Sequence, residues 1–311
     1  MKFAFLVMCE FRGVKSTIDN IYKNLIKPYD ADVFICVQKA LPDDEERMNL
    51  FNENVVYREV YDKPDPAAYF GEQNNLDIPG GNWNMQSNLQ IYINYHKMAT
   101  VIENVYDQYD YFIILRPDSQ ILFPFPNKEL FGNVPESIYL IDGNYCKWWG
   151  DIGMPGIIHK NYILGVLSCY YNVISNKEYR NPIFEIVNGE NILSKPGELN
   201  QERFFYVCMH IFNLYNKIKK INNVNFFWTA EKVNDYHTWS KPHMHPRRNV
   251  ISKYDDQCDE AFANNDLWNT DKYMWSINKN NLNIELSLKN PPAHVQPKAI
   301  LRNTMSSVLY K

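Results

Sequence analysis

The chain has 311 residues, of which 45% are hydrophobic and 22% charged, and its formal net charge is −4. These proportions are typical of a globular protein that buries a substantial core, as one large domain or two small ones. The slight negative charge excludes an electrostatic footprint for nucleic acid, so we expect no nucleic-acid partner. No run approaches the roughly 18 apolar residues of a membrane helix, so we expect no integral membrane segment.

The six cysteines are scattered along the chain without a Cys-x-x-Cys pair, and several lie in apolar strand or helix contexts. Reduced, buried thiols have this distribution. We therefore expect a reducing, cytoplasmic compartment. The first apolar run, 2–9, is too short for a signal peptide with its cleavage site, and it predicts the first strand instead.

The first part of the chain alternates strand and helix. A continuous apolar strand over 3–8 leads into a polar loop over 10–15. Ser16 or Thr17 is expected to cap the helix that follows, where apolar residues recur at helical spacing. A second buried strand over 32–37 completes a β-α-β unit. This unit predicts a parallel sheet with right-handed crossovers.

The rest of the chain predicts further strands and helices separated by loops. Up to the next buried strand we expect a charged helix at 43–51, a strand at 55–60, a long loop at 61–84, a helix at 85–106 and a strand at 111–115. A loop of that length inside a domain is usually functional or disordered. Later we expect strands at 137–141 and 224–229 and helices at 160–176 and 198–214. The tail from Tyr236 has few periodic signals and is expected to wrap the outside of the core.

The most informative segment is the end of the strand at 111–115, which runs directly into Arg116, Pro117 and Asp118. Ligands of open α/β sheets bind just outside the carboxyl ends of the strands. A carboxylate there is placed for a metal, a phosphate-bound cation or a sugar hydroxyl, and the alternative is a turn aspartate after proline. Arg116 suits bidentate contact with phosphate. It could equally pair with a neighbouring carboxylate and hold the strand end.

Five short motifs follow one another along the chain: Phe11-Arg12-Gly13, Asp32 to Ile35, Tyr109 to Asp118 with its Arg-Pro-Asp end, Gly150-Asp151 and Asn200-Gln201-Glu202. Taken together, these motifs resemble the GT-A-fold glycosyltransferases of bacterial lipopolysaccharide and capsule synthesis and of large DNA viruses. The resemblance covers roughly residues 1–235, and its short motifs are specific only in combination.

The resemblance implies an α/β fold with a GT-A-like (Rossmann-like), mainly parallel central sheet, flanking helices and an irregular C-terminal section. We expect one nucleotide-sugar and acceptor-binding domain over 1–249 and an extension over 250–311 that packs on it. The implied activity is hexosyl or pentosyl transfer from a nucleoside-diphosphate sugar to a hydroxyl of a glycan or glycoprotein acceptor. Inversion at the anomeric carbon is expected, since a general base is easier to nominate here than a nucleophile.

Residues for the donor follow from the same resemblance. Arg12 and Lys15 are candidates for the phosphates, although an arginine in this loop could simply be exposed. Arg116 and Asp118 are further candidates. Trp149 could stack on a sugar ring or pack its loop onto the core.

The family's Asp-x-Asp motif binds Mn²⁺ or Mg²⁺ against the donor diphosphate. Its counterpart here is Asp118-Ser119-Gln120, which lacks the second carboxylate. Because a hard cation needs several oxygen ligands, metal dependence becomes an open question. His243 or His245 could complete the metal shell, and the alternative for this His-x-His pair is a surface turn.

Asp151 and Glu202 are rival candidates for the general base that takes the acceptor proton. A glutamate at a helix start is also expected from the helix dipole alone. Two other functions stay open: a catalytically inactive carbohydrate-binding or scaffold protein of the same fold, and a sulfo- or phosphotransferase. The chain has no Gly-x-Ser-x-Gly and no Gly-x-Gly-x-x-Gly after the first strand, which argues against a serine hydrolase and a dinucleotide oxidoreductase.

Overall fold

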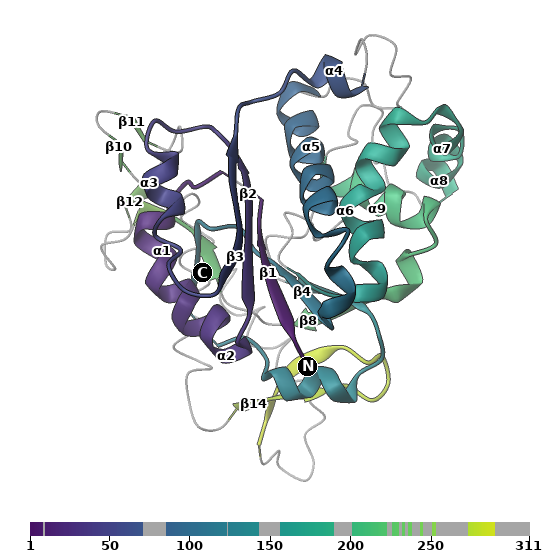
Figure 1. Cartoon of the computed structure of the whole chain (residues 1–311). Coiled ribbons are helices and arrows are strands. Elements are labelled where there is room, and N and C mark those ends of the chain that lie inside the picture. Colours follow the sequence, from purple (N-terminus) through teal and green to yellow (C-terminus); the bar gives the residue numbers. More distant parts are fainter. Residues whose placement is uncertain are drawn as a thin grey trace, which may run out of the picture.

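The structure is a computed structural model that describes most of the chain up to residue 222 and several later segments. The described residues are 1–8, 10–70, 85–122, 124–142, 156–189, 201–222, 226–229, 232–233, 236–237, 243–244, 251–252 and 273–289. Within them, a nine-stranded sheet lies between two groups of helices (Figure 1). None of the described helices is long and apolar enough to cross a bilayer.

The central sheet has the strand order β14-β15-β8-β6-β7-β4-β1-β2-β3. Strands β7 and β14 run antiparallel to their neighbours, and the other pairings are parallel, so the expected mainly parallel sheet is confirmed. The strands are β1 (Phe3–Val7), β2 (Asp32–Gln38), β3 (Val55–Tyr61), β4 (Tyr111–Ile114), β6 (Ile138–Asp142), β7 (Gly156–His159), β8 (Ile218–Asn222), β14 (Tyr273–Ile277) and β15 (Ile284–Leu288).

Smaller ladders lie outside this sheet. Strand β5 pairs with β9, β10 with β11, and β12 with β13, each pair antiparallel. Their bounds are β5 (Ser119–Ile121), β9 (Phe226–Trp228), β10 (Lys232–Val233), β11 (Tyr236–His237), β12 (His243–Met244) and β13 (Ile251–Ser252).

Helices cover both faces of the sheet (Figure 1). One face carries α1 (Val14–Ile21), a π-helical turn (Tyr22–Ile26), α2 (Lys27–Tyr29) and α3 (Asp44–Met48). The other face carries α5 (Met85–Ile102), α6 (Lys160–Ser175) and α9 (Gln201–Ile211). The remaining short helices are α4 (Pro66–Phe70), α7 (Lys177–Arg180) and α8 (Ile183–Gly189).

Strand β1 shows why the inner strands have continuous apolar sequences. Its side chains alternate between the two faces, so that Ala4 and Leu6 pack with α5 and α6, while Phe5 and Val7 pack with α1. Every residue of β1 is completely buried. A parallel strand covered by helices on both faces leaves no position for a polar side chain.

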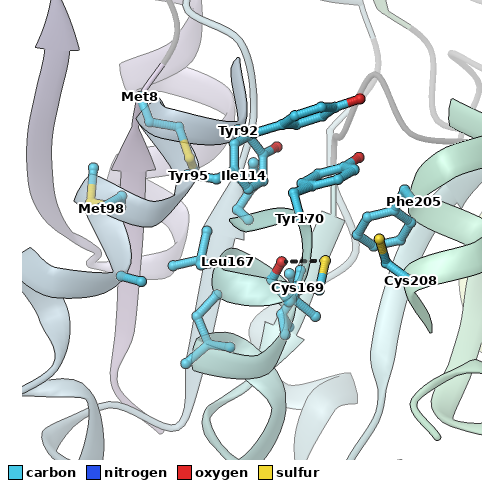
Figure 2. Packing of buried hydrophobic residues seen from close by; sticks show 14 of the residues in the cluster. Met8, Tyr92, Tyr95, Met98, Ile114, Leu167, Cys169, Tyr170, Phe205 and Cys208 are labelled. Atoms are coloured by element: carbon cyan, nitrogen blue, oxygen red, sulfur yellow. Dashed lines mark hydrogen bonds between the residues drawn. The ribbon is translucent and has the colours of Figure 1, made fainter. Parts of the chain in front are cut away.

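The layer between the sheet and helices α5, α6 and α9 is rich in aromatic and sulfur-containing side chains (Figure 2). Tyr92 and Tyr170 stack with their ring centroids 4.2 Å apart. The Cys169 thiol donates a hydrogen bond to the Val166 carbonyl at 3.2 Å. Burial, together with a hydrogen bond involving Cys169, raises the pKa of Cys208 well above its usual value. Such protonated, buried thiols are structural rather than reactive.

The sequence-based boundaries hold approximately for most elements of the first 142 residues. Helix α4, however, lies inside the expected loop at 61–84, and strand β5 was not predicted. A further correction concerns α1. Gly13 is the N-cap of this helix, and Ser16 and Thr17 lie inside its first turns. The second half differs more from expectation. Strands β7 and β8 were not predicted, and the hairpin β14–β15 belongs to the central sheet rather than to an irregular outer tail.

Candidate functional site

The order of the strands reverses at β1, which makes its carboxyl end the expected place for a ligand. Strands β2 and β3 lie on one side of β1, and β4 lies on the other. In open α/β sheets the ligand crevice forms at this reversal, outside the carboxyl ends of the strands. The loops that leave β1 (10–13) and β4 (115–118) therefore frame the candidate site.

Gly13 joins these two loops through close packing. Its φ of +72° is a left-handed conformation that side chains disfavour. A Cβ atom at this position would lie 2.4 Å from Thr229 Oγ1 and 2.8 Å from Asp118 Cβ. Only glycine lets the loop after β1 approach the loop after β4 so closely.

Asp118 is 2% exposed and has its charge matched locally. Its Oδ1 accepts a hydrogen bond from Arg116 Nε at 2.9 Å, and its Oδ2 accepts one from Arg116 Nη2. The guanidinium itself is about a quarter exposed, at 24%. A buried carboxylate is costly unless it is paired in this way. Of the two roles considered for Arg116, the structure shows the pairing that holds the strand end.

Ser16, Thr17 and Thr229 are three hydroxyl-bearing residues whose hydrogen bonds hold the two loops in place. The Thr17 hydroxyl lies 3.1 Å from the Gly13 carbonyl and also within hydrogen-bonding distance of the Pro117 carbonyl. The Ser16 hydroxyl donates to the Gly13 carbonyl at 2.8 Å. The hydroxyl and the backbone N–H of Thr229 both donate to the Asp118 carbonyl, at 3.2 and 2.8 Å, and the Ser16 hydroxyl lies 3.3 Å from the Thr229 hydroxyl. Sequence reasoning missed this role for all three residues, although for Ser16 and Thr17 hydroxyl groups early in a helix commonly bond backward to carbonyls.

Arg12 and Lys15 differ in their availability to a ligand. Arg12 forms an ion pair with Glu10, and its side chain remains 33% exposed beside the strand ends. Lys15 Nζ lies 2.9 Å from Asp43 and 3.1 Å from Glu46, and these hydrogen bonds raise its pKa. With two carboxylates around it, Lys15 is occupied within the protein, whereas Arg12 has one partner and faces outward.

Helix α3 contributes a buried cation beneath the same loop. Arg47 is 1% exposed, and its Nε donates to Asp43 Oδ1 at 2.9 Å. Its Nη1 donates to the backbone carbonyl of Phe11 at 3.1 Å. The hydrogen bond from Arg47, followed by that from Lys15, lowers the pKa of Asp43 to about 2.

We expect Asp43→Asn to weaken the protein at neutral pH and to change its response to acid. The folded-state pKa of Asp43 lies below the unfolded value of about 3.9. Its contribution is therefore complete above about pH 4 and is lost as the pH falls through about 2. We expect a neutral-pH loss on the order of 1 kcal/mol, because the pair is partly exposed and screened. Urea unfolding from pH 7 to 2 measures this, and parallel profiles for the two proteins would contradict it.

The described surroundings of Asp118 do not fit a divalent cation. Both oxygens of the carboxylate are occupied by Arg116, and the neighbouring Ser119 adds one neutral, buried hydroxyl. Mn²⁺ and Mg²⁺ require several oxygen ligands with negative charge. Among the described residues, no group of three or more His, Cys, Asp or Glu side chains is placed to hold a metal ion.

The remaining candidates fall at or beyond the limits of what the structure describes. Asp151, Trp149 and His245 lie outside the described residues. Glu202 lies in the first turn of α9 and His243 lies in β12, where the backbone alone is described. Their proposed roles stay predictions.

No protein-family model matches the chain, and no curated protein matches it either. Distant likenesses appear among solved structures. One is a glycosyltransferase involved in glycosylation of the major capsid of PBCV-1, with 9% identity, 62% of this chain and 77% of that chain covered, and a TM-score of 0.28.

Two further solved structures are similar at the same level. The galactosyltransferase LgtC with donor and acceptor sugar analogues is 11% identical, with 71% of this chain and 73% of that chain covered and a TM-score of 0.32. The mannosyltransferase Ktr4p from S. cerevisiae is 10% identical, with 84% of this chain and 80% of that chain covered and a TM-score of 0.30. Likenesses this distant establish neither a shared activity nor a shared substrate, so the case for function rests on the residues of this chain.

Proposed function

We propose that the chain is a glycosyltransferase that moves a sugar from a nucleoside-diphosphate sugar to a hydroxyl of a glycan acceptor. One observation carries this proposal. At the point where the strand order reverses, the loop bearing Arg12 packs through Gly13 directly against the Arg116–Asp118 pair. The site thus brings two partly exposed guanidinium groups to the edge of the sheet where ligands of such folds bind.

The chemistry suits a diphosphate leaving group. As the acceptor hydroxyl attacks the anomeric carbon, the bond from that carbon to the diphosphate oxygen breaks, and negative charge grows on the diphosphate. Guanidinium groups bind phosphate oxygens in bidentate fashion, and a pre-positioned cation stabilises charge that develops in the transition state. In this proposal Arg12 and Arg116 bind the diphosphate, and Asp118 acts through Arg116 by fixing the plane of its guanidinium.

The acceptor proton requires a base, and Asp151 and Glu202 remain the proposed candidates. A divalent cation, implied by the family resemblance, also remains a proposal that would depend on His243 and His245. Because the described residues around Asp118 do not make up a cation site, no step here is assigned to a metal.

A thermal-shift screen with UDP, GDP, CMP and ADP, with and without Mn²⁺, tests the proposal. A nucleotide that binds only the folded state stabilises it by about 2.7 kcal/mol at a hundredfold excess over its Kd. We expect either UDP or GDP to raise the melting temperature of the wild type but not that of Asp118→Asn, and CMP, which lacks a diphosphate, to leave both unchanged.

Asp110→Asn is the matched control, because Asp110 precedes the opposite end of the same strand and accepts from the Lys2 amide at 2.8 Å. The nucleotide should still stabilise this variant. Stabilisation by ADP alone would favour a sulfo- or phosphotransferase. Absence of any shift would overturn the nucleotide site.

The second candidate is a catalytically inactive carbohydrate-binding or scaffold protein. It is favoured by Gln120, which stands where the family motif carries its second carboxylate. Hydrolysis of the nucleotide sugar in the absence of acceptor separates the two functions. A transferase releases nucleoside diphosphate slowly above background, and an inactive binder releases none.

A further inference from the structure

The loop after β1 is held from below by a residue that lies outside the candidate site. The Arg47 side chain is almost fully buried beneath it and donates to the Phe11 carbonyl at 3.1 Å. The backbone N–H of Val14 donates to the same carbonyl at 3.3 Å. The Phe11 carbonyl therefore accepts hydrogen bonds both from the start of α1 and from α3.

Burying a guanidinium is costly, and the arrangement around Arg47 compensates for it with specific hydrogen bonds. Its Nε bonds Asp43 at 2.9 Å, and Asp43 in turn is bonded by Lys15 from α1. The buried cation thus connects α3, the loop after β1 and the start of α1. The loop's own aromatic residue adds to the connection, because the Phe11 ring packs 6.2 Å from the Phe51 ring.

We propose that Arg47 is a positioning residue for the donor diphosphate. It fixes the Phe11 carbonyl and thereby the places of Arg12 and Gly13, while its own side chain stays buried below the loop. The expected consequence of this positioning, tighter binding of the donor, rests on the proposed function. Its structural part, a loop whose order depends on Arg47, stands independently of what the site binds.

Arg58 of β3 provides a matched control at the far end of α3. Its Nη2 donates to the Phe51 carbonyl at 2.6 Å, and its Nη1 donates to Asn49 Oδ1 at 3.3 Å. Arg58→Met therefore removes an arginine-to-carbonyl hydrogen bond of the same kind. It leaves the contacts of the Phe11 carbonyl unchanged.

The experiment compares Arg47→Lys, Arg47→Met and Arg58→Met by amide hydrogen exchange and by donor kinetics. In Arg47→Met we expect exchange of the Val14 and Ser16 amides to accelerate about tenfold, the effect of losing one charged hydrogen bond. In Arg58→Met these amides should exchange as in the wild type, and acceleration should appear near Phe51.

For the donor, we expect Arg47→Met to raise Kd and KM about tenfold and to lower kcat several-fold, because a displaced Arg12 contacts the diphosphate less well both in the bound donor and in the transition state. Arg47→Lys keeps the charge and should recover part of the loss. Should Arg47→Met fail to fold, Arg47→Lys alone is compared with Arg58→Lys by the same measurements.

The hydrogen-exchange and donor-binding results together distinguish a failure of the positioning role of Arg47 from a failure of the proposed glycosyltransferase function. Faster exchange in the Arg47 variants together with no nucleotide binding by the wild type would keep the positioning role and reject the proposed function. Unchanged exchange at Val14 and Ser16, or equal effects of the Arg47 and Arg58 substitutions on KM, would overturn the positioning role while leaving the proposed function standing.

Discussion

Replacing Gly13 with alanine is expected to destabilise the fold by about 3 kcal/mol and to abolish nucleotide binding. The left-handed backbone disfavours any side chain, and the added Cβ would lie 2.8 Å from Asp118 Cβ and 3.2 Å from Asp118 Cα. A main-chain neighbour cannot rotate away, so the two loops must separate. Urea unfolding and a nucleotide titration measure the two effects.

Gly189→Ala is the control for this substitution. Gly189 ends α8, and a Cβ at this position would meet no atom within 4 Å. Its replacement should change stability by no more than about 0.5 kcal/mol. If Gly13→Ala were as stable as Gly189→Ala and still bound nucleotide, the close contact between the loops would not be required.

The second large effect is expected for Asp118→Asn. This change leaves the Arg116 guanidinium facing a neutral amide in a mostly buried setting, with an expected loss of about 2 kcal/mol, reduced from the fully buried case because Arg116 is partly exposed. Under the proposed function, turnover should fall at least about 100-fold, since Arg116 loses its orientation. Urea unfolding and initial rates of sugar transfer measure the two losses.

A double-mutant cycle with Arg116→Met isolates the pair itself. Removing both charges should destabilise the protein less than the sum of the two single changes, because neither partner is then left uncompensated. Strict additivity would show that the pair contributes nothing through its mutual contact. Asp110→Asn, at the other end of β4, should leave turnover unchanged.

The sequence predicts the inner strands well because burial on both faces demands continuous apolar runs, as in β1 and β2. Strand β8 escaped prediction since its Ile-Lys-Lys-Ile-Asn sequence has two lysines at its centre. The hairpin β14–β15 turns through Leu282, which has a left-handed conformation. Asparagines flank this position at 278, 280, 281 and 283, but the left-handed residue itself is a leucine rather than the usual glycine or asparagine.

Part of the candidate site was predictable from the arrangement of the parallel strands. Loops after adjacent parallel strands must meet, so Gly13 and Asp118 could be placed together from the strand order alone. Thr229 could not, because 111 residues separate it from Asp118 and no local pattern encodes that contact. Arg47 belongs to a short charged helix whose sequence resembles an exposed one, and only tertiary packing shows that it is buried.

The ladder between β5 and β9 has a consequence for the order in which this protein is built. Neighbouring strands β3, β2, β1 and β4 come from the first 114 residues, whereas Ser119 pairs with Trp228. Closing so long a chain segment is entropically expensive and slow. The Asp118 loop can gain its Thr229 contacts only late, because Thr229 is synthesised 111 residues after Asp118. A growing chain therefore contains all four strands that frame the crevice well before it contains the residue that completes the contacts of the Asp118 loop.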